Sequence, residues 1–154
     1  PLGDVRQRVL RPAGRALLHS VGRRRPTPPN AWLEKRNFPG SDPPSLRERM
    51  AIFDAHRVSI MDVENLRLHD AKTLIEWLAR FDAHTDTVHD MYDQHFVRAW
   101  RLYLGGCAAA FLANSLQLFQ VVFAHPDNNA LPLTREHLYR PEPDALQTWD
   151  FGYD

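Results

Sequence analysis

Three side chains are candidates for chemistry: His19, Asp70 and Cys107. His19 closes a short apolar run that predicts a strand, and open α/β sheets hold ligands at the carboxyl ends of their strands. A histidine there can exchange a proton with a ligand, although a lone histidine in such a place is more often structural. Cys107 has no activating base evident in the sequence, which indicates a small buried hydrophobic side chain rather than a nucleophile.

Asp70 stands directly before a helical pattern. A carboxylate in that place is a good N-cap, and this is the interpretation that we favour, with a direct active-site role as the alternative. The other seven histidines form no HExxH motif and no Cys/His cluster, so no metal site is predicted.

Composition fits one soluble globular domain with a core: 154 residues, 44% hydrophobic and 25% charged. No apolar run approaches the roughly 20 residues of a membrane span, and the first residues do not resemble a signal peptide. The single cysteine excludes an internal disulfide and is typical of a reducing compartment. The chain starts at Pro1 without a methionine, which suggests a fragment or a processed product.

The net charge of zero hides an asymmetry, because residues 1 to 60 carry 12 Lys and Arg against 5 Asp and Glu. An ordinary solvated surface explains this, and a patch that attracts anionic phospholipid head groups is the functional alternative. Nucleic acid is not the expected partner, because a proline-rich turn follows Arg23 to Arg25 in place of interleaved stacking aromatics.

The elements that must position these residues follow an α/β order. The patterns predict helices over 5–11, 46–56, 69–83 and from 93 onward, strands over 15–21, 58–63 and 116–124, and a structured loop or lid over 22–44. The strand at 15–21 suits a parallel sheet covered on both faces, and the strand at 116–124 is apolar on both parities and therefore central. Trp32 and Phe38 are candidates to anchor the loop.

Two helices carry apolar stripes. Leu74, Trp77, Leu78 and Phe81 share one face, and Phe96, Trp100, Tyr103, Cys107 and Phe111 share another. We expect residues 1–125 to form one partial domain and residues 126–154 an irregular tail. The chain is too short for a complete doubly wound sheet.

Four motifs occur together in a fixed order: Leu17-Leu18-His19-Ser20-Val21, Phe38-Pro39-Gly40, His69-Asp70-Ala71-Lys72-Thr73-Leu74 and Tyr103-Leu104-Gly105-Gly106-Cys107. In these motifs the chain resembles the cyclopropane-fatty-acyl-phospholipid synthases and the mycolic acid cyclopropane synthases, which are S-adenosylmethionine-dependent methyltransferases. The resemblance covers roughly residues 5 to 125.

The resemblance implies the last three strands of a Rossmann-like class I methyltransferase fold, including its antiparallel final strand, with the two long helices as the insertion that forms an acyl pocket. It implies that Phe38, Leu74, Tyr103 and Phe111 line the lipid channel and that Cys107 lies near the acyl chain. The glycine-rich loop that holds the methyl donor in the family has no counterpart in this sequence.

In the family, a bound bicarbonate is proposed to take the proton whose loss closes the cyclopropane ring. The resemblance carries over His19 as a donor to that anion and Val21 as a backbone contact, while two further ligands of the family lie outside this chain. Asp70 occupies the position of a tyrosine ligand, where a carboxylate would repel the anion unless it is protonated or paired.

The resemblance therefore implies an enzyme that transfers a methyl group from S-adenosylmethionine to the double bond of an unsaturated phospholipid acyl chain, or a relative that makes a methyl-branched or hydroxylated product. Its implied partners are phospholipid acyl chains at the membrane surface, with a homodimer as one assembly, and its implied location is cytoplasmic and peripheral to the inner membrane. The alternative is a non-catalytic remnant or companion subunit that binds lipid or a protein through an exposed sheet edge.

Overall fold

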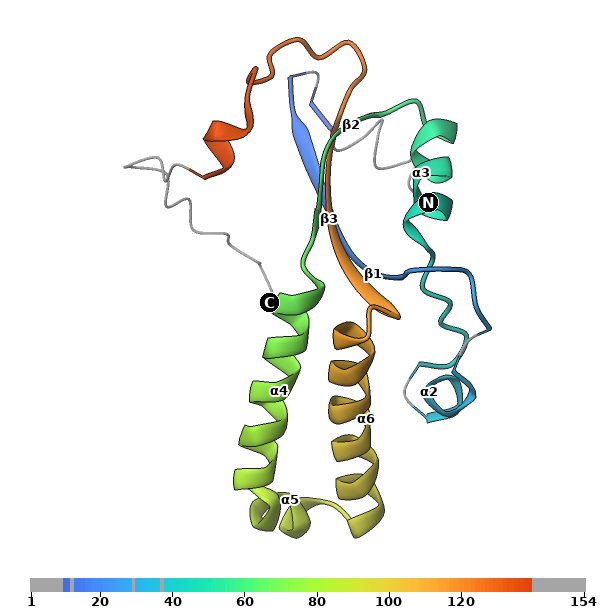
Figure 1. Ribbon diagram of the computed structural model, residues 1–154, viewed down its shortest axis with the longest axis vertical. Helices are drawn as coiled ribbons and strands as arrows, with labels where there is room; N and C mark the ends of the chain where they lie inside the picture. The colour runs from blue at the N-terminus through green and yellow to red at the C-terminus, as the bar shows by residue number, and fades with distance from the viewer. Residues whose placement is uncertain (1–9, 12, 29, 37, 140–154) are drawn as a thin grey trace.

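A sheet of three strands organises the computed structural model, which describes residues 10–139 except 12, 29 and 37 (Figure 1). The strands β1 (Arg15–Arg23), β2 (Ser59–Asn65) and β3 (Leu116–Ala124) lie in the order β1-β3-β2. β3 pairs antiparallel with both neighbours over long registers, from Arg15 opposite Ala124 to Arg23 opposite Leu116 on one side. The predicted central position of β3 and the antiparallel final strand are both confirmed.

The described residues do not test whether β1 belongs to a parallel sheet that is covered on both faces. Among the described residues it pairs with β3 through one edge, and its residues alternate between the two faces of the sheet. Leu18 packs into the core, whereas Leu17 is 54% exposed and Val21 is 40% exposed on the other face. The apolar run thus predicts the strand correctly but does not indicate which elements cover its faces.

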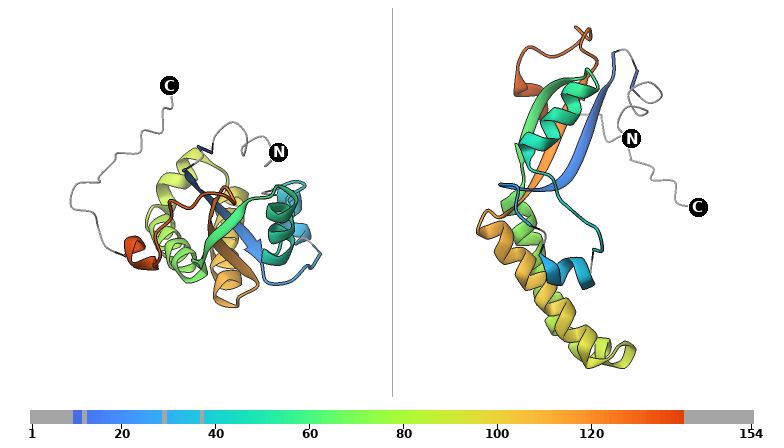
Figure 2. Two further views of the ribbon diagram at one scale, coloured as in Figure 1. Left: turned by 90° about the horizontal axis from the view of Figure 1, so that it is seen from above. Right: turned by 90° about the vertical axis from the view of Figure 1, so that its right-hand side faces the viewer.

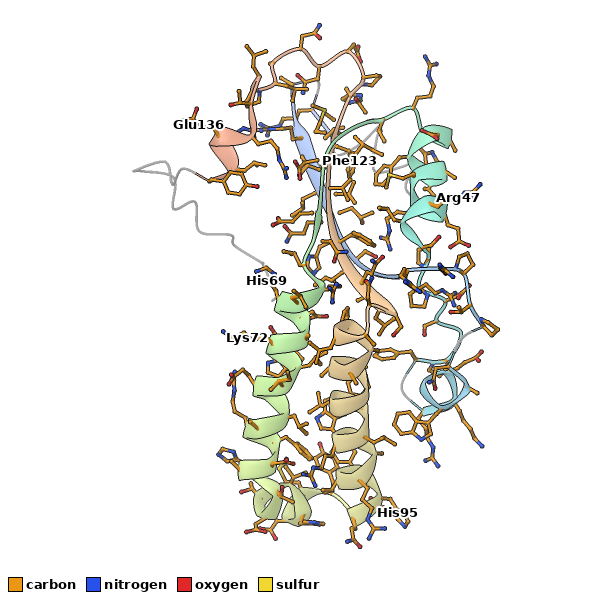
Figure 3. All side chains as sticks on the ribbon, in the orientation of Figure 1. Arg47, His69, Lys72, His95, Phe123 and Glu136 are labelled. Atoms are coloured by element: carbon orange, nitrogen blue, oxygen red, sulfur yellow. The ribbon has the colours of Figure 1, made fainter. Side chains whose placement is uncertain are left out.

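Helix α3 (Leu46–Ala55) covers one face of the sheet. Ser45 begins it with the predicted capping box: the Ser45 hydroxyl accepts from the backbone N–H of Glu48, and the Glu48 carboxylate accepts from the backbone N–H of Ser45. Phe53 is fully buried and its ring lies 5.2 Å from that of Phe123, which Figure 3 labels between the sheet and this helix. Phe119 and Val121 complete this core, because alternate residues of a strand share a face.

Helices α4 (Arg67–Ala83) and α6 (Gln94–Leu112) form an antiparallel pair that extends from one end of the sheet (Figures 1 and 2). The predictions for both helices are confirmed to within two residues, whereas the short α5 (Thr85–Met91) between them was not predicted. The two helices bury a second core against the start of β3, made by Ala71, Leu74, Leu104, Cys107, Ala108, Phe111 and Leu118. Trp77 is an exception to the predicted stripe, because half of it is exposed.

Arg67 fastens the base of this helix pair. Its Nη1 atom donates to the carbonyl oxygen of Phe111 at 3.0 Å, so a cation meets the carbonyl end of α6, where the helix dipole favours positive charge. The backbone N–H of Leu66 also donates to the carbonyl of Leu118 at 2.8 Å. These bonds join the start of α4 to both α6 and β3.

The remaining described segments lie around the sheet. The loop after β1 contains a helix that was not predicted, α2 (Ala31–Arg36), and the segment after β3 ends in a 3-10 helix, η1 (Arg135–Leu138). Arg135 of η1 pairs with Asp62 of β2 at 2.8 Å, which ties this part of the predicted irregular tail to the sheet. The helix predicted over residues 5–11 lies largely outside the described residues. Within the described part of the chain, no helix is long and apolar enough to cross a membrane.

Phe53 gives a direct test of the sheet-to-helix core. We expect Phe53→Ala to lower the free energy of unfolding by about 3–5 kcal/mol, because it removes a fully buried ring and leaves a cavity. Ile52→Ala, one position earlier and 42% exposed, is the matched control and should cost less than about 1 kcal/mol. Urea denaturation of both variants measures the difference, and equal costs would contradict this account of the core.

Candidate functional site

A cavity of about 510 Å³ opens between the helix pair, the end of β1 and the loop that follows β1. Its volume is in the range of small-molecule binding sites. Apolar and aromatic side chains make most of its wall. They are Val21, Phe38, Leu74, Trp77, Tyr103, Cys107, Ala110, Phe111 and Leu116.

The polar part of the wall comes mostly from the loop, which Arg23 holds in place. The Arg23 side chain is buried, and its Nε atom donates to the carbonyl oxygen of Pro43 at 2.7 Å. Its two other nitrogens bond the carbonyl oxygen of Thr27 and pair with the carboxylate of Asp42. One guanidinium therefore binds both ends of the loop, as its planar fork of five donors allows.

The four predicted lipid-channel residues all line this one cavity: Phe38, Leu74, Tyr103 and Phe111. Leu74 comes from α4, Tyr103 and Phe111 come from α6, and Phe38 reaches in from the loop, where its ring lies 5.8 Å from the ring of Tyr103. Phe38 therefore anchors the loop, as its position predicted. The aromatic row continues along α6 from Tyr103 to Trp100 and Phe96 and then to Tyr92 at the end of α5, with neighbouring rings 4.3 to 6.0 Å apart.

His19 and Val21 lie on the same open face of β1, one pleat apart. Val21 lines the cavity, and its backbone carbonyl accepts a hydrogen bond from Nη2 of Arg49 at 2.9 Å. His19 is exposed and is not part of the cavity wall. The side-chain amide of Gln120 lies within hydrogen-bond distance of its Nδ1 atom, at 3.2 Å.

Asp70 lies in the first turn of α4 and lines the cavity. The favoured N-cap interpretation is wrong, because the helix begins earlier than expected: its N-cap is Leu66, and the backbone N–H of Asp70 already donates to the Leu66 carbonyl. Partial burial raises the pKa of the Asp70 carboxyl above its usual value, and the nearby charge of His19 partly offsets this rise.

Cys107 and Tyr103 stand one turn apart on α6 and both face the cavity. The two side chains are close enough to influence each other's pKa. Burial raises the pKa of the Cys107 thiol, and the negative charge of Asp70 raises it further. A thiol held protonated in this way is a poor nucleophile, which agrees with the expectation from the sequence.

The described residues do not form a cradle for an adenosine-containing methyl donor. None of the described glycines lies in a turn that joins a strand to a helix. Gly22 is required by the chain itself, since a Cβ atom there would come within 2.8 Å of the Pro44 carbonyl oxygen. A bicarbonate between His19, Val21 and Asp70 does not fit either while Asp70 is ionised, because two anions would share one partly buried site.

The sequence of the segment that forms this site matches known proteins. The family described as mycolic acid cyclopropane synthetase matches residues 4–121. The cyclopropane-fatty-acyl-phospholipid synthase of Escherichia coli strain K12 is 36% identical over 133 residues, which are 85% of this chain and 34% of that protein. A probable fatty acid methyltransferase of Pseudomonas putida is 34% identical over 112 residues, covering 71% of this chain and 28% of that protein.

Solved structures give the same fold. The mycolic acid cyclopropane synthase CmaA1, complexed with SAH and CTAB, superposes with a TM-score of 0.70 at 23% identity, over 79% of this chain and 48% of that one. The cyclopropane synthase MmaA2 from Mycobacterium tuberculosis gives a TM-score of 0.69 at 21% identity, over 75% of this chain and 46% of that one. The three-stranded sheet is thus part of a Rossmann-like methyltransferase fold.

The chain spans about a third of the length of the curated relatives that it matches. Within that third, the family match extends from before β1 into β3 and so includes the wall of the cavity on every element described above. The chain belongs to the mycolic acid cyclopropane synthetase family.

Proposed function

We propose that the protein adds a methyl group from S-adenosylmethionine to the double bond of an unsaturated phospholipid acyl chain, giving a cyclopropane, and that this chain supplies the acyl-binding part of the site. The observation that carries the proposal is the cavity, in which the four residues expected to line the lipid channel converge. The named activity of the Escherichia coli relative supports the same reaction.

The cavity suits a hydrocarbon chain better than a polar substrate. Leu74 and Phe111 form part of the buried core behind it, and Phe38 and Tyr103 give it aromatic walls. Burial of each methylene of an acyl chain contributes about 0.8 kcal/mol, so even a short length of chain provides useful affinity. The chain's own contribution is to bind and orient the alkene and to keep water from it, while the bound cofactor supplies the methyl group.

A basic loop adjoins this cavity. Arg24 and Arg25 are exposed at the end of β1 and just before Thr27 and Pro28, which line the cavity, and Lys35 and Arg36 end helix α2. An acyl chain held in the cavity would leave its phosphate near these cations. This arrangement supports a peripheral position at a membrane surface that carries anionic phospholipid.

Filling the cavity should weaken acyl binding. We expect Ala110→Phe, which places a ring in the cavity, to reduce the affinity for cis-9-hexadecenoic acid about tenfold, the equivalent of displacing about two methylenes. Ala109→Phe is the matched control, since its side chain is exposed on the same helix. Calorimetric titration measures both, and an equal loss in the two variants would locate acyl binding elsewhere.

The basic loop predicts dependence on anionic lipid. The double variant Arg24→Gln/Arg25→Gln should bind vesicles of phosphatidylglycerol and phosphatidylcholine about thirtyfold more weakly, at about 1 kcal/mol per cation. Arg47→Gln/Arg57→Gln removes two exposed cations from the α3 side, where Figure 3 shows Arg47 pointing away from the sheet, and should have little effect. Vesicle sedimentation checks this, and equal binding by the two double variants would rule out the loop as the contact.

The reaction itself is tested with the complete protein in which these 154 residues occur. Incubation with methyl-labelled S-adenosylmethionine and vesicles that contain cis-vaccenoyl phospholipid should give a labelled cyclopropane acyl chain, identified by mass spectrometry after methanolysis. Acyl binding without any methyl transfer would contradict the proposal and would favour a lipid-binding companion protein.

A further inference from the structure

Ring closure requires a base, and the described wall of the cavity offers few. Four of its side chains can in principle accept a proton: Glu34, Asp70, Tyr103 and Cys107. Burial and the neighbouring groups raise the pKa of both Tyr103 and Cys107, which keeps these two protonated. Glu34 is exposed on the short helix α2 at the loop side of the cavity. Asp70 is the one carboxylate of the described wall that is partly buried beside the apolar lining.

No structural task within the described part of the molecule accounts for the Asp70 carboxylate. It does not cap α4, and it makes no side-chain hydrogen bond or ion pair with the described residues. On the same helix, His69 and Lys72 point away from α6 (Figure 3), so neither neutralises it. The groups that act on it electrostatically come from other elements: His19 on β1, and Tyr103 and Cys107 on α6.

We propose that the carboxylate of Asp70 is the catalytic base of this protein, and that it takes the place of the bicarbonate ion on which the family is thought to rely. The inference rests on the proposed function. It follows from the position of Asp70 in the cavity wall, from its lack of any other partner among the described residues, and from the poor fit of a second anion beside it.

The proton transfer is balanced within this site. Once methylation has left a cation on the acyl chain, one C–H bond of the new methyl group breaks, and its electron pair forms the third bond of the cyclopropane ring. The proton goes to a carboxylate oxygen of Asp70, which becomes neutral. His19 acts on the charge of Asp70 from the neighbouring strand β1.

The electrostatics agree with this role. Burial raises the pKa of Asp70, which makes the carboxylate a stronger base than an exposed one, while the charge of His19 limits the rise. Because the base must be ionised, ring closure should increase as the pH rises through the pKa of Asp70, which lies above its ordinary value. A carboxylate at this point also places negative charge next to the acyl cation, which it stabilises.

The test compares the complete protein with Asp70→Asn, Asp70→Tyr and the control Glu76→Gln, an exposed carboxylate on the same helix. Release of S-adenosylhomocysteine reports methyl transfer, and mass spectrometry of the acyl chains reports ring closure. Each variant is assayed in bicarbonate-depleted buffer and again after bicarbonate is added. We expect wild type and Glu76→Gln to change less than twofold on addition.

Asp70→Asn should lose ring closure about a hundredfold at unchanged fold, with methylated but open acyl products in its place. Asp70→Tyr should make cyclopropane only when bicarbonate is added, with at least a tenfold stimulation. A wild-type enzyme that needs bicarbonate, or an Asp70→Asn variant that still closes the ring, would overturn the assignment of the base. A wild type that releases no S-adenosylhomocysteine would instead overturn the proposed function, so the two failures are distinguishable.

Stability supplies a readout that does not depend on turnover. Since the folded pKa of Asp70 is raised, the folded state loses stability relative to the unfolded state as pH rises from the unfolded pKa to the folded one, and the cost persists above both. Asp70→Asn should therefore unfold at the same or a higher urea concentration at pH 7. A clear loss of stability would show a structural role and would also overturn the proposal.

Discussion

The antiparallel pairing of β3 with both β1 and β2 is the constraint on which the other parts of this molecule depend. Of the three described strands β3 is the last in sequence and the middle one in space, so this sheet cannot be completed until residues 116–124 have been made. Its residues serve both cores: Phe119, Val121 and Phe123 face α3, whereas Leu118 packs with the α4/α6 pair. Because its register sets Val21 opposite Leu118, it also fixes where β1 meets the helices, and hence where the cavity forms.

Three arginine side chains connect the elements around that sheet, and each of them donates to a backbone carbonyl oxygen. Arg23 binds the loop, Arg49 binds the edge of β1 at Val21, and Arg67 binds the end of α6. A guanidinium offers five donors, so one side chain can satisfy carbonyl groups that no helix or sheet pairs. Burying a guanidinium carries an energetic cost, as at Arg49. Its Nε atom is buried without a hydrogen-bond partner among the described residues, and burial lowers the pKa of the side chain. The shape of the cavity thus depends on these three cations, of which Arg23 also lines its wall.

Regular elements were predictable from the sequence because local patterns decide them. The capping box at Ser45, the apolar spacing on α4 and α6, and the two-sided apolar run of β3 each predicted an element within a few residues. The family motifs named four residues that line one cavity, Phe38, Leu74, Tyr103 and Phe111, and the order of these motifs carried the signal. The roles of Arg23 and Arg67 were not predictable, since an arginine is normally assigned to the surface until its long-range carbonyl partners are known. The N-cap at Asp70 failed because the helix begins at Arg67, only a few residues earlier.

Asp70 lies in the first turn of α4 rather than at its N-cap, and this changes how its charge is stabilised. An aspartate at an N-cap is satisfied by backbone N–H groups, and its charge then has a local structural explanation. One turn further into the helix, the same side chain faces the cavity without such donors, and its desolvation is not offset by any hydrogen bond that the structure describes. A position that favours the neutral form of an acid cannot also favour a bound anion next to its charged form. An ionised Asp70 therefore disfavours a second anion beside it, and the low polarity of the apolar wall strengthens that repulsion.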